Sequence, residues 1–513
     1  MNAIQLSIFS SRIESVCDEM GAILQRAAFS PNIKDRLDFS CAVFDSSGKL
    51  SAQAAHIPVH LGSMAYAMQD IVSLFDWQPG DMVALNDPYL GGTHLPDVTL
   101  VAPLFIKNRL QGFVANRAHH ADIGSEAPGS MPLSTCLQEE GLIIPPLKIM
   151  SFNKRTKDFE ELLENLGNTV ESTGDFNAQI SANLRGAARL VSIIDSYGVD
   201  EYELAVEQLN GYADRLMLQL LKSIPDGVYR FSDVMDDDGF GAKNIPIQLA
   251  LTVNDAEVTA DFSATAKQVK GNINCPLSVV AAAVYYVFRC LMPANAPACY
   301  GLFDRINIIA EKGSLINAIK PAAVAAGNVE TSTRLVDVVM GALANAIPEK
   351  IPAASHGSMN NVAMGVRDSR KSWSYYETIG GGMGAGKFHD GKSAVQTHMT
   401  NTLNTPIESL EMHYPLRITR YQIRKSSGGV GQHRGGDGLL REMEFLASAQ
   451  VTLLTERRKN KPWGLFGGQS GECGLNKLNG EVLPAKTSFS VTAGDCLTIL
   501  TPGGGGYGNV EGM

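Results

Sequence analysis

The amino-acid sequence predicts an α+β protein of several domains, with mixed helices, largely antiparallel or mixed sheets, and a C-terminal third rich in strands and loops. The chain has 513 residues, which at roughly 150 residues per domain gives about three domains. Apolar residues recur at helical spacing in some segments and alternate with polar residues in others. From about Ile351 onward glycine becomes frequent and helical periodicity fades.

The composition is that of a globular protein. Apolar residues make up 44% of the chain and charged residues 19%, which excludes a disordered chain or a coiled coil. A net charge of -10 without any long basic run argues against nucleic acid as a partner. The longest apolar run, residues 275–288, is shorter than the roughly 18 residues of a membrane span, and the start of the chain lacks a secretory signal pattern. We therefore expect a cytoplasmic protein that has no membrane partner.

The first predicted region, residues 1–170, combines helices and strands and bears the candidate metal site. An apolar stripe at steps of three and four predicts an N-terminal helix, and a hairpin should turn at Ser46 to Gly48. A helix over 65–75, a strand after Gly80 and an ordered loop over 86–97 follow. Strands are expected over 98–105 and 113–118. The helical stripe consists of Phe9, Ile13, Val16, Met20 and Leu24.

The second region, residues 171–350, should contain a helical hairpin followed by strands. Two helical stripes between 175 and 225 meet at Gly198, so we expect two antiparallel helices there. Strict alternation over 247–262, interrupted at Asn254 and Asp255, predicts a β-hairpin with one solvated face. The apolar run 275–288 should be a buried helix. The third region, residues 351–513, is rich in glycine, should be mainly β, and closes near TPGGGGYG.

Histidines cluster in the first region, where five of the ten lie between residues 56 and 120. His94 and Asp97 stand three apart in the predicted loop, while His119, His120 and Asp122 follow a predicted strand. Mixed imidazole and carboxylate ligands suit a divalent transition metal (zinc, manganese or iron) and disfavour calcium. Asp38 is a further candidate carboxylate. The alternative is that these histidines cap loops and satisfy buried carbonyl groups.

Three other motifs are interpreted as structural. GGMGAGK, residues 381–387, resembles a phosphate-binding loop, but Phe388 stands where a serine or threonine is required, so this chain should not bind ATP there. The acidic stretch 233–239 places Val234 at the first ligand position of a calcium loop and is expected to be a solvated turn. The glycine run 503–506 is expected to form tight turns.

Several segments together resemble one known family, the B subunits of ATP-dependent hydantoinases and oxoprolinases, which are related to the α subunit of acetone carboxylase. The resemblance extends along nearly the whole chain and is specific. The segments that carry it are RLDFSCAVFD (36–45), HIPVHLGSM (56–64), GDMVALNDPYLGGTHLPDVTL (80–100), RAHHADIG (117–124), GDFNAQISAN (174–183), GNVETSTRLVD (327–337) and TPGGGGYG (501–508).

The resemblance implies a metal site on this chain and an ATPase on another. By matching motifs, His94, Asp97 and His119 are expected to bind the ion, although spacing alone does not separate His119 from its neighbour. Asp38 and Asp122 are the candidate catalytic carboxylates that orient or deprotonate water. Residues expected to support the ligands are His120, His60, Glu126 and Arg117. Arg334 and Asp337 are expected to form an ordinary surface pair on a helix.

The implied activity is the opening of a small cyclic amide in a hetero-oligomer. A hydantoinase A-type ATPase subunit would bind ATP and phosphorylate the substrate oxygen, which makes a poor electrophile reactive, and the metal of this chain would then supply an activated water. One alternative is a ketone carboxylase of the acetone carboxylase type. Another is a scaffold of the ATPase subunit that carries out no chemistry of its own.

Overall fold

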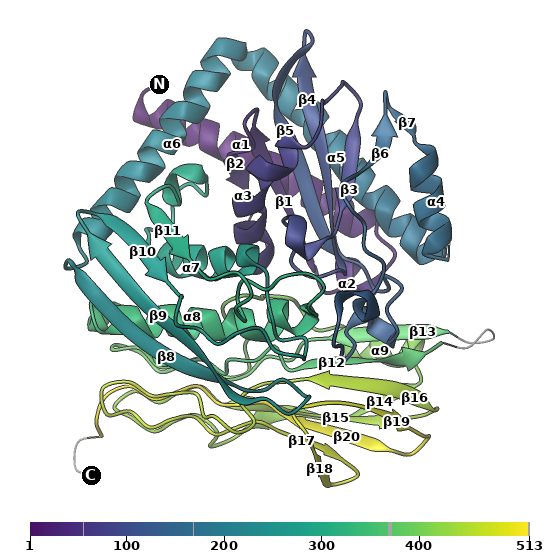
Figure 1. Cartoon of the computed structure of the whole chain (residues 1–513), viewed down its shortest axis with the longest axis vertical. Coiled ribbons are helices and arrows are strands. Elements are labelled where there is room, and N and C mark those ends of the chain that lie inside the picture. Colours follow the sequence, from purple (N-terminus) through teal and green to yellow (C-terminus); the bar gives the residue numbers. More distant parts are fainter. Residues whose placement is uncertain (55, 168, 368–371, 511–513) are drawn as a thin grey trace.

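The computed structural model describes residues 1–54, 56–167, 169–367 and 372–510. In Figure 1 the N-terminal helices and the largest sheet form the upper part, the middle of the chain lies below them, and the strands of the last third form the base. The mixture of helices with separate, mostly antiparallel sheets agrees with the predicted fold class. Among the described helices, none combines the length and apolar composition needed to cross a membrane.

The largest sheet is antiparallel throughout and has the strand order β2-β1-β5-β4-β3-β6-β7. It confirms the predicted hairpin at residues 46–48 and the two strands that follow the candidate loop. Its strands are β1 (Phe39–Asp45), β2 (Leu50–Gln53), β3 (Met82–Leu85), β4 (Asp97–Ile106), β5 (Arg109–His119), β6 (Leu147–Ser151) and β7 (Lys154–Arg155).

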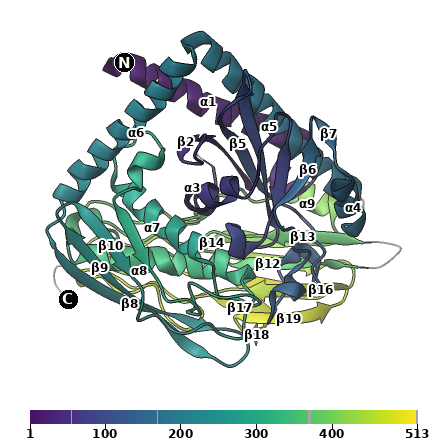
Figure 2. The same cartoon turned by 45° about the horizontal axis from the view of Figure 1, so that its top comes forward.

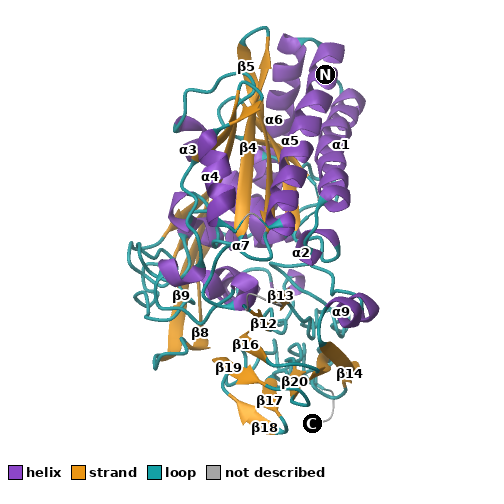
Figure 3. Cartoon of the chain, turned by 90° about the vertical axis from the view of Figure 1, so that its right-hand side faces the viewer, coloured by secondary structure: helices purple, strands orange, loops and turns teal. Residues whose placement is uncertain are grey.

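Helices cover both faces of this sheet (Figure 3). The N-terminal helix buries all five residues of its predicted stripe and lies beside a long later helix on one face. The helix predicted over 65–75 begins earlier, because Pro58 occupies its first turn, and lies on the other face. These elements are α1 (Ala3–Ala27), α2 (Pro31–Lys34), α3 (Pro58–Ser73), α4 (Lys157–Asn165), α5 (Val170–Tyr197) and α6 (Val199–Lys222).

The predicted helical hairpin is not formed by α5 and α6. The two helices meet at Gly198, which has φ 84° and ψ 150°, but they diverge from that point like the sides of a wedge (Figures 1 and 2). The reason is a competing partner for α5: Asn116 on β5 donates to the carbonyl of Gln179, and the Gln179 side chain donates to the carbonyl of Val98 on β4. Helix α5 therefore packs on the sheet rather than along α6.

The middle region contains a mixed sheet of order β11-β10-β9-β8, in which only β10 and β11 run parallel. The predicted hairpin turning at Asn254 and Asp255 is confirmed, and β9 alternates between buried and exposed residues. The predicted buried helix is α7. The elements are β8 (Gly227–Asp237), β9 (Lys243–Asn254), β10 (Glu257–Asp261), β11 (Ile306–Ile309), α7 (Leu277–Leu291) and α8 (Ser332–Ala344).

The last third is mainly β, as predicted. Its two sheets have the orders β13-β12-β16-β19 and β14-β15-β20-β17-β18. Its elements are β12 (Asn361–Val366), β13 (Trp373–Glu377), α9 (Ile407–His413), β14 (Leu416–Arg424), β15 (Gly438–Phe445), β16 (Ala449–Leu454), β17 (Leu475–Leu478), β18 (Glu481–Leu483), β19 (Lys486–Val491) and β20 (Cys496–Leu500). Short helical turns are η1 (Pro88–Leu90), η2 (Pro128–Ser130), η3 (Leu137–Glu140), η4 (Tyr300–Leu302), η6 (Pro348–Lys350) and the π-helical η5 (Gly327–Thr331).

Two structural expectations for the glycine-rich motifs have different outcomes. GGMGAGK is followed by a short turn and no helix, so the rejection of a phosphate-binding loop agrees with the structure. Glycines 503–506 do not form tight turns, and their φ angles lie outside the left-handed region. Glycine is required here because the backbones of several loops lie in direct contact, without room for side chains. The amide of Gly504 donates to the carbonyl of Gly436 at 2.9 Å, and the carbonyl of Gly504 accepts from the amide of Gly429 at 2.8 Å. We call this contact between loops the glycine mesh.

The acidic stretch 233–239 is not a solvated turn. It forms the end of β8 and the start of the following turn, and Asp236 is fully buried. Asp233 receives a hydrogen bond from Arg457 at 2.7 Å, which also bonds Asp337 at 2.7 Å. The predicted surface pair on α8 is therefore wrong as well: Arg334 and Asp337 are 0% and 1% exposed. The carboxylates are buried because cations from the last third neutralise them.

Candidate metal centre

Three neighbouring strands bring the candidate residues together at one edge of the largest sheet. Asp97 is the first residue of β4 and pairs directly with His119, the last residue of β5. Asp38 immediately precedes β1, and its carbonyl accepts a hydrogen bond from the backbone N–H of His119 at 3.0 Å. Directly opposed residues on adjacent strands place their side chains on the same face, so the ladder itself sets the spacing of these groups.

Two histidines complete the cluster from outside the sheet. His94 lies in the loop before β4, and its Nε2 is 3.2 Å from Oδ2 of Asp97. His60 lies in the first turns of α3, with Nε2 3.2 Å from Oδ1 of Asp97 and 4.0 Å from Oδ1 of Asp38. The sequence placed His60 in a supporting role, whereas the structure brings it to the same carboxylate as His94.

Several nitrogen atoms of this cluster are buried without a hydrogen bond from any described residue. They are both ring nitrogens of His94 and Nε2 of His119. Ligand atoms of His94, Asp97 and His119 lie within 4.8 Å of one another. Buried polar atoms normally find a partner because an unpaired one costs about 1–3 kcal/mol. A divalent cation bound by imidazole and carboxylate would satisfy these atoms, so the residues present fit such an ion.

The electrostatics favour a charged carboxylate and at least one neutral imidazole. Burial alone would raise the pKa of Asp97, but the neighbouring His60 and His94 lower that pKa well below its ordinary value. Burial, reinforced by the charge of His94, lowers the pKa of His119 well below its usual range. Burial raises the pKa of Asp38, against the opposing effects of Arg36 and His60. A deprotonated histidine and an ionised aspartate are the protonation states that bind metal ions.

His119 is held on both sides by residues from distant parts of the chain. Its ring stacks on Tyr376 with centroids 4.9 Å apart and planes 2° apart, and Arg36 lies over the same tyrosine. Its Nδ1 is 3.1 Å from the side-chain amide of Asn32, which also contacts Arg36. As placed, Nδ2 of Asn32 faces Nδ1 and the oxygen of Asn32 accepts from Arg36, so Nδ1 is the acceptor here. Metal binding through Nε2 requires the ring hydrogen on Nδ1 and therefore an Asn32 side chain turned over so that its oxygen faces the ring.

A small cavity of about 20 Å³ adjoins the cluster. This volume accommodates roughly one water molecule. Residues from all three predicted regions enclose it: Asp38, Ile57, Val59, His60, His94 and His119 from the first, Asn328 and Val329 from the second, and Met359, Tyr376, Thr378, Met399 and Thr400 from the third. The site is therefore assembled only when the whole chain has folded.

His120 and Arg117 are buried, but they act on opposite sides of β5. Alternation along the strand directs Asn116 and His120 toward α5, where Nε2 of His120 lies 2.9 Å from the side-chain oxygen of Gln179. Arg117 points the other way, toward α3 and the candidate loop, and donates to Ser63 and to the carbonyl of Gly91. Only Arg117 can therefore support the metal cluster, through the elements that carry its residues.

Asp122 and Glu126 are not brought to the cluster. The Asp122 side chain is 43% exposed and accepts two hydrogen bonds from Arg367, at 2.8 and 2.9 Å. Glu126 is also exposed. The chain leaves the sheet after His119 and turns toward solvent, so proximity in sequence to the histidine pair does not produce proximity to the site. Of the two candidate catalytic carboxylates, only Asp38 lines the cavity.

Asn328 is the site residue that sequence reasoning missed. It lies in the π-helical turn η5, and its amide donates to Oδ2 of Asp97 at 3.3 Å, beside Thr93, which donates to the same oxygen at 2.5 Å. Single π-helical turns occur often at functional sites because they redirect a side chain. The signal was present in the motif GNVETSTRLVD, but no spacing rule connects it to residue 97.

The comparisons with known proteins identify the family. A family model described as hydantoinase B/oxoprolinase matches residues 2–510. The chain belongs to this family. It is 38% identical to 5-oxoprolinase 1 of Arabidopsis thaliana over 99% of its own length but only 42% of that protein. It is 33% identical to a protein of Pseudomonas sp. (strain NS671) named as a subunit of a D-/L-hydantoinase, covering 99% of this chain and 90% of the relative.

Solved structures show the same architecture. The crystal structure of ATP-dependent caprolactamase from Pseudomonas jessenii superposes with a TM-score of 0.92 at 29% identity, covering 99% of this chain and 91% of that one. A nucleotide-free acetone carboxylase structure has a TM-score of 0.87 at 17% identity, covering 99% and 76%. The second likeness, at this identity, is one of fold alone.

Proposed function

We propose that this chain is the metal-bearing part of an ATP-dependent cyclic amide hydrolase, which opens a hydantoin, 5-oxoproline or a related lactam. The convergence of His60, His94 and His119 on a small cavity, with the Asp97 carboxylate 3.2 Å from both His60 and His94, carries this proposal. A hydantoinase A-type ATPase, supplied by a partner subunit in the cytoplasm, binds ATP and phosphorylates the carbonyl oxygen. The 5-oxoprolinase relatives are more than twice as long as this chain, which is consistent with a second functional part elsewhere.

The residues of this chain hold the site in a state ready for hydrolysis. A zinc, manganese or iron ion bound by His94, Asp97, His119 and His60 would act as a Lewis acid that acidifies water and polarises the substrate. Asp97 stays ionised because His60 and His94 face it. Asp38 stands at the cavity wall, where its carboxylate can orient a water and accept its proton. The small volume of the cavity limits the water around an activated substrate, which reduces unproductive hydrolysis.

Metal content and turnover test the proposal together. Purified chain should hold about one transition-metal ion, and His94→Ala or Asp97→Ala should remove both the ion and the ATP-dependent opening of a cyclic amide by the reconstituted complex. Asp122→Asn is the matched control, because that carboxylate is paired on the surface with Arg367. A metal-free wild-type chain, together with active variants at His94 and Asp97, would overturn the proposal.

The alternative activity is ketone carboxylation, which the similarity in fold to acetone carboxylase raises. One assay separates the two activities. A hydrolase consumes ATP with a cyclic amide in the absence of bicarbonate, whereas a carboxylase consumes ATP only with a ketone and bicarbonate together. The higher sequence identity to the caprolactamase favours the hydrolase.

A further inference from the structure

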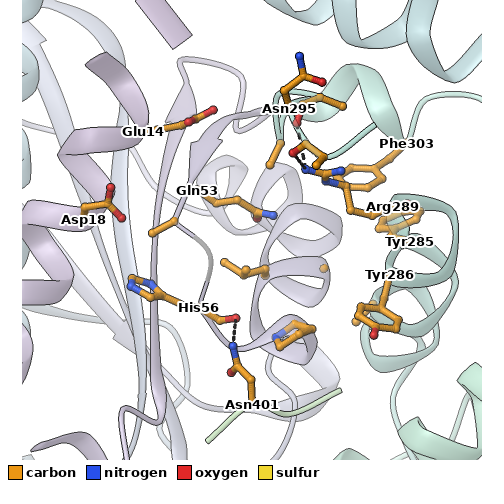
Figure 4. Close-up of a pocket in the computed structure, with 18 residues that line it drawn as sticks. Glu14, Asp18, Gln53, His56, Tyr285, Tyr286, Arg289, Asn295, Phe303 and Asn401 are labelled. Carbon is orange, nitrogen blue, oxygen red and sulfur yellow. Dashed lines mark hydrogen bonds between the residues drawn. The ribbon is translucent and has the colours of Figure 1, made fainter. Parts of the chain in front are cut away.

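A pocket of about 590 Å³ lies beside the metal cavity, between α1, α3 and α7 (Figure 4). The two spaces share a wall at the start of α3, where successive residues face different sides. The pocket is lined by His56, Pro58, Leu61 and Gly62, and the metal cavity by Ile57, Val59 and His60. Here one segment of the chain, residues 56–62, separates the large pocket from the candidate ligands.

A second segment completes the shared wall. Met399 and Thr400 face the metal cavity, while Asn401 faces the pocket. The two segments are joined by a backbone hydrogen bond from Val59 to Met399 at 3.3 Å and by the side chain of Asn401, which donates to the carbonyl of His56 at 3.3 Å (Figure 4). We call residues 56–62 with 399–401 the partition. Its two hydrogen bonds are long, so little hydrogen-bond energy opposes separation of the segments.

The partition adjoins a strained residue. His398, immediately before Met399, has φ 62°, a left-handed conformation that costs energy in a residue other than glycine. Its Nδ1 lies 3.5 Å from the hydroxyl of Tyr286, a residue of the pocket wall, and its Nε2 is buried without a hydrogen bond from the described residues. The backbone at His398 can therefore release strain when Met399 and Thr400 move.

The sizes of the two spaces require such a movement. The metal cavity holds roughly one water, and a cyclic amide occupies several times the roughly 30 Å³ that water takes up in the liquid. No ring can therefore reach the ligands in the present conformation. The adjoining pocket falls within the roughly 300–1,000 Å³ typical of small-molecule sites.

The lining of the pocket suits a small ring amide. Tyr285 and Phe303 stack with centroids 4.3 Å apart and form an aromatic wall for the carbon side of a ring. The side-chain oxygen of Gln53 is buried and lacks a donor among the described residues, and a turn of this lining side chain toward the pocket lets the oxygen accept the N–H of an amide. Arg289 is the one cation among the described lining residues, and it lies across the pocket from the acidic Glu14 (Figure 4).

We propose that this pocket receives the cyclic amide and that displacement of residues 399–401, the part of the partition that carries no proposed metal ligand, delivers the ring to the metal cluster. The proposal rests on the proposed function, because it names the place where that function's substrate class first binds. The aromatic wall holds the ring carbons, Gln53 accepts the amide N–H, and the carbonyl side faces α3.

Variants can fill the pocket without changing the metal ligands. Ala298 is half-buried in the pocket lining, so Ala298→Trp places an indole where the ring would lie. Ala188 is exposed on α5, and Ala188→Trp adds the same side chain away from the pocket. Gln53→Leu is a second, milder variant that removes the side-chain amide at similar volume, which keeps the test decisive if Ala298→Trp fails to fold.

Two measurements are made on each variant. Saturation-transfer NMR with caprolactam and with 5-oxoproline reports binding to the full chain in the absence of ATP. Steady-state kinetics of the complex with its ATPase report KM and kcat, with metal content measured in parallel. We expect Ala298→Trp and Gln53→Leu to lose the NMR signal and to raise KM at least tenfold at unchanged metal content, while Ala188→Trp matches the wild type.

The outcomes separate this proposal from the proposed function. Unchanged NMR transfer and unchanged KM in Ala298→Trp and Gln53→Leu would overturn the pocket assignment while leaving hydrolysis intact. A second outcome is that these variants lose NMR transfer but the wild-type complex never opens a ring. That outcome would support the pocket and refute the hydrolase activity. If Ala298→Trp dissociates the complex but both variants still bind the ring, the pocket is a contact of the partner subunit, and the proposal is wrong.

Discussion

His119 and Tyr376 stack face to face at 4.9 Å, although one ends a strand in the first third of the chain and the other belongs to β13 in the last third. Tyr376 also donates its hydroxyl to Asn361 at 2.7 Å, which fixes the ring from the far side. The position of a candidate metal ligand thus depends on a strand that contributes no ligand. Loss of contacts in the last third should therefore weaken the metal site.

His60 should be required for metal binding, whereas His120 should not. His60→Gln removes the imidazole nearest to Oδ1 of Asp97 and should lower metal affinity by more than roughly tenfold. His120→Gln is the control, because that ring faces Gln179 on the other side of the sheet. Titration of metal-free protein with zinc, followed by calorimetry, measures both. Equal affinities of the two variants would contradict the proposed ligand set.

Removal of Asp337 should destabilise the chain strongly. Asp337→Ala removes one of the two carboxylates that Arg457 contacts while Asp233 remains, and loss of a buried hydrogen bond to a charged group costs about 1.5–3 kcal/mol. Lys267→Ala, which breaks the exposed pair with Glu311, should change the free energy of unfolding by less than about 1 kcal/mol. Urea denaturation measures both variants. Similar losses would mean that the buried network contributes no more than a surface pair.

The glycine mesh should require glycine because a side chain has no space there, and not because of the φ angle. A Cβ atom on Gly504 would lie 2.1 Å from the carbonyl oxygen of Met383, so Gly504→Ala should lower the free energy of unfolding by about 1–3 kcal/mol. Gly211 lies in α6, where a Cβ would approach only the end of Arg215, at 3.5 Å. Gly211→Ala should therefore stabilise by about 0.5–1 kcal/mol. Thermal denaturation of the two variants should shift in opposite directions.

Acidification should destabilise the protein through His356. Burial of this side chain lowers its pKa from 6.5 to about 3. The unfolded chain binds a proton near pH 6.5 and the folded chain does not, so this residue's contribution is complete above pH 6.5 and declines as the pH falls toward 3. Between pH 7 and pH 5 it should cost about 2 kcal/mol. His356→Gln should reduce the loss of stability over that interval by this amount. If the free energy of unfolding falls equally with pH in the wild type and in His356→Gln, this contribution of His356 is excluded.

The sequence predicted those parts of the structure that local patterns determine. The amphipathic stripe of α1, the hairpin of β1 and β2, and the strands on either side of the candidate loop all follow from periodicity and turn residues. His94, Asp97 and His119 could be selected because they flank those strands. The cross-strand pairing of residues 97 and 119 then converts two sequence positions into one site.

Tertiary contacts decided the remainder. His60 reaches Asp97 because of the way α3 docks on the sheet, and no spacing along the chain encodes that docking. Asp122 illustrates the opposite error, since it follows the histidine pair but lies where the backbone turns outward to Arg367. The burial of Arg334 depends on Glu456, a carboxylate from the last third. Periodicity describes a helix face but does not say which distant charge will cover it.

The glycine mesh also constrains the order in which the protein can assemble. It joins backbone near residues 382, 429, 436 and 504, which belong to three separate parts of the chain. Contacts between remote segments form slowly because the intervening chain must first lose its freedom. As the ribosome releases the polypeptide, the loop around Gly436 can bond Met383, but its contact with Gly504 has to wait until that later segment emerges. The glycine mesh is therefore among the contacts that form late as the chain is synthesised.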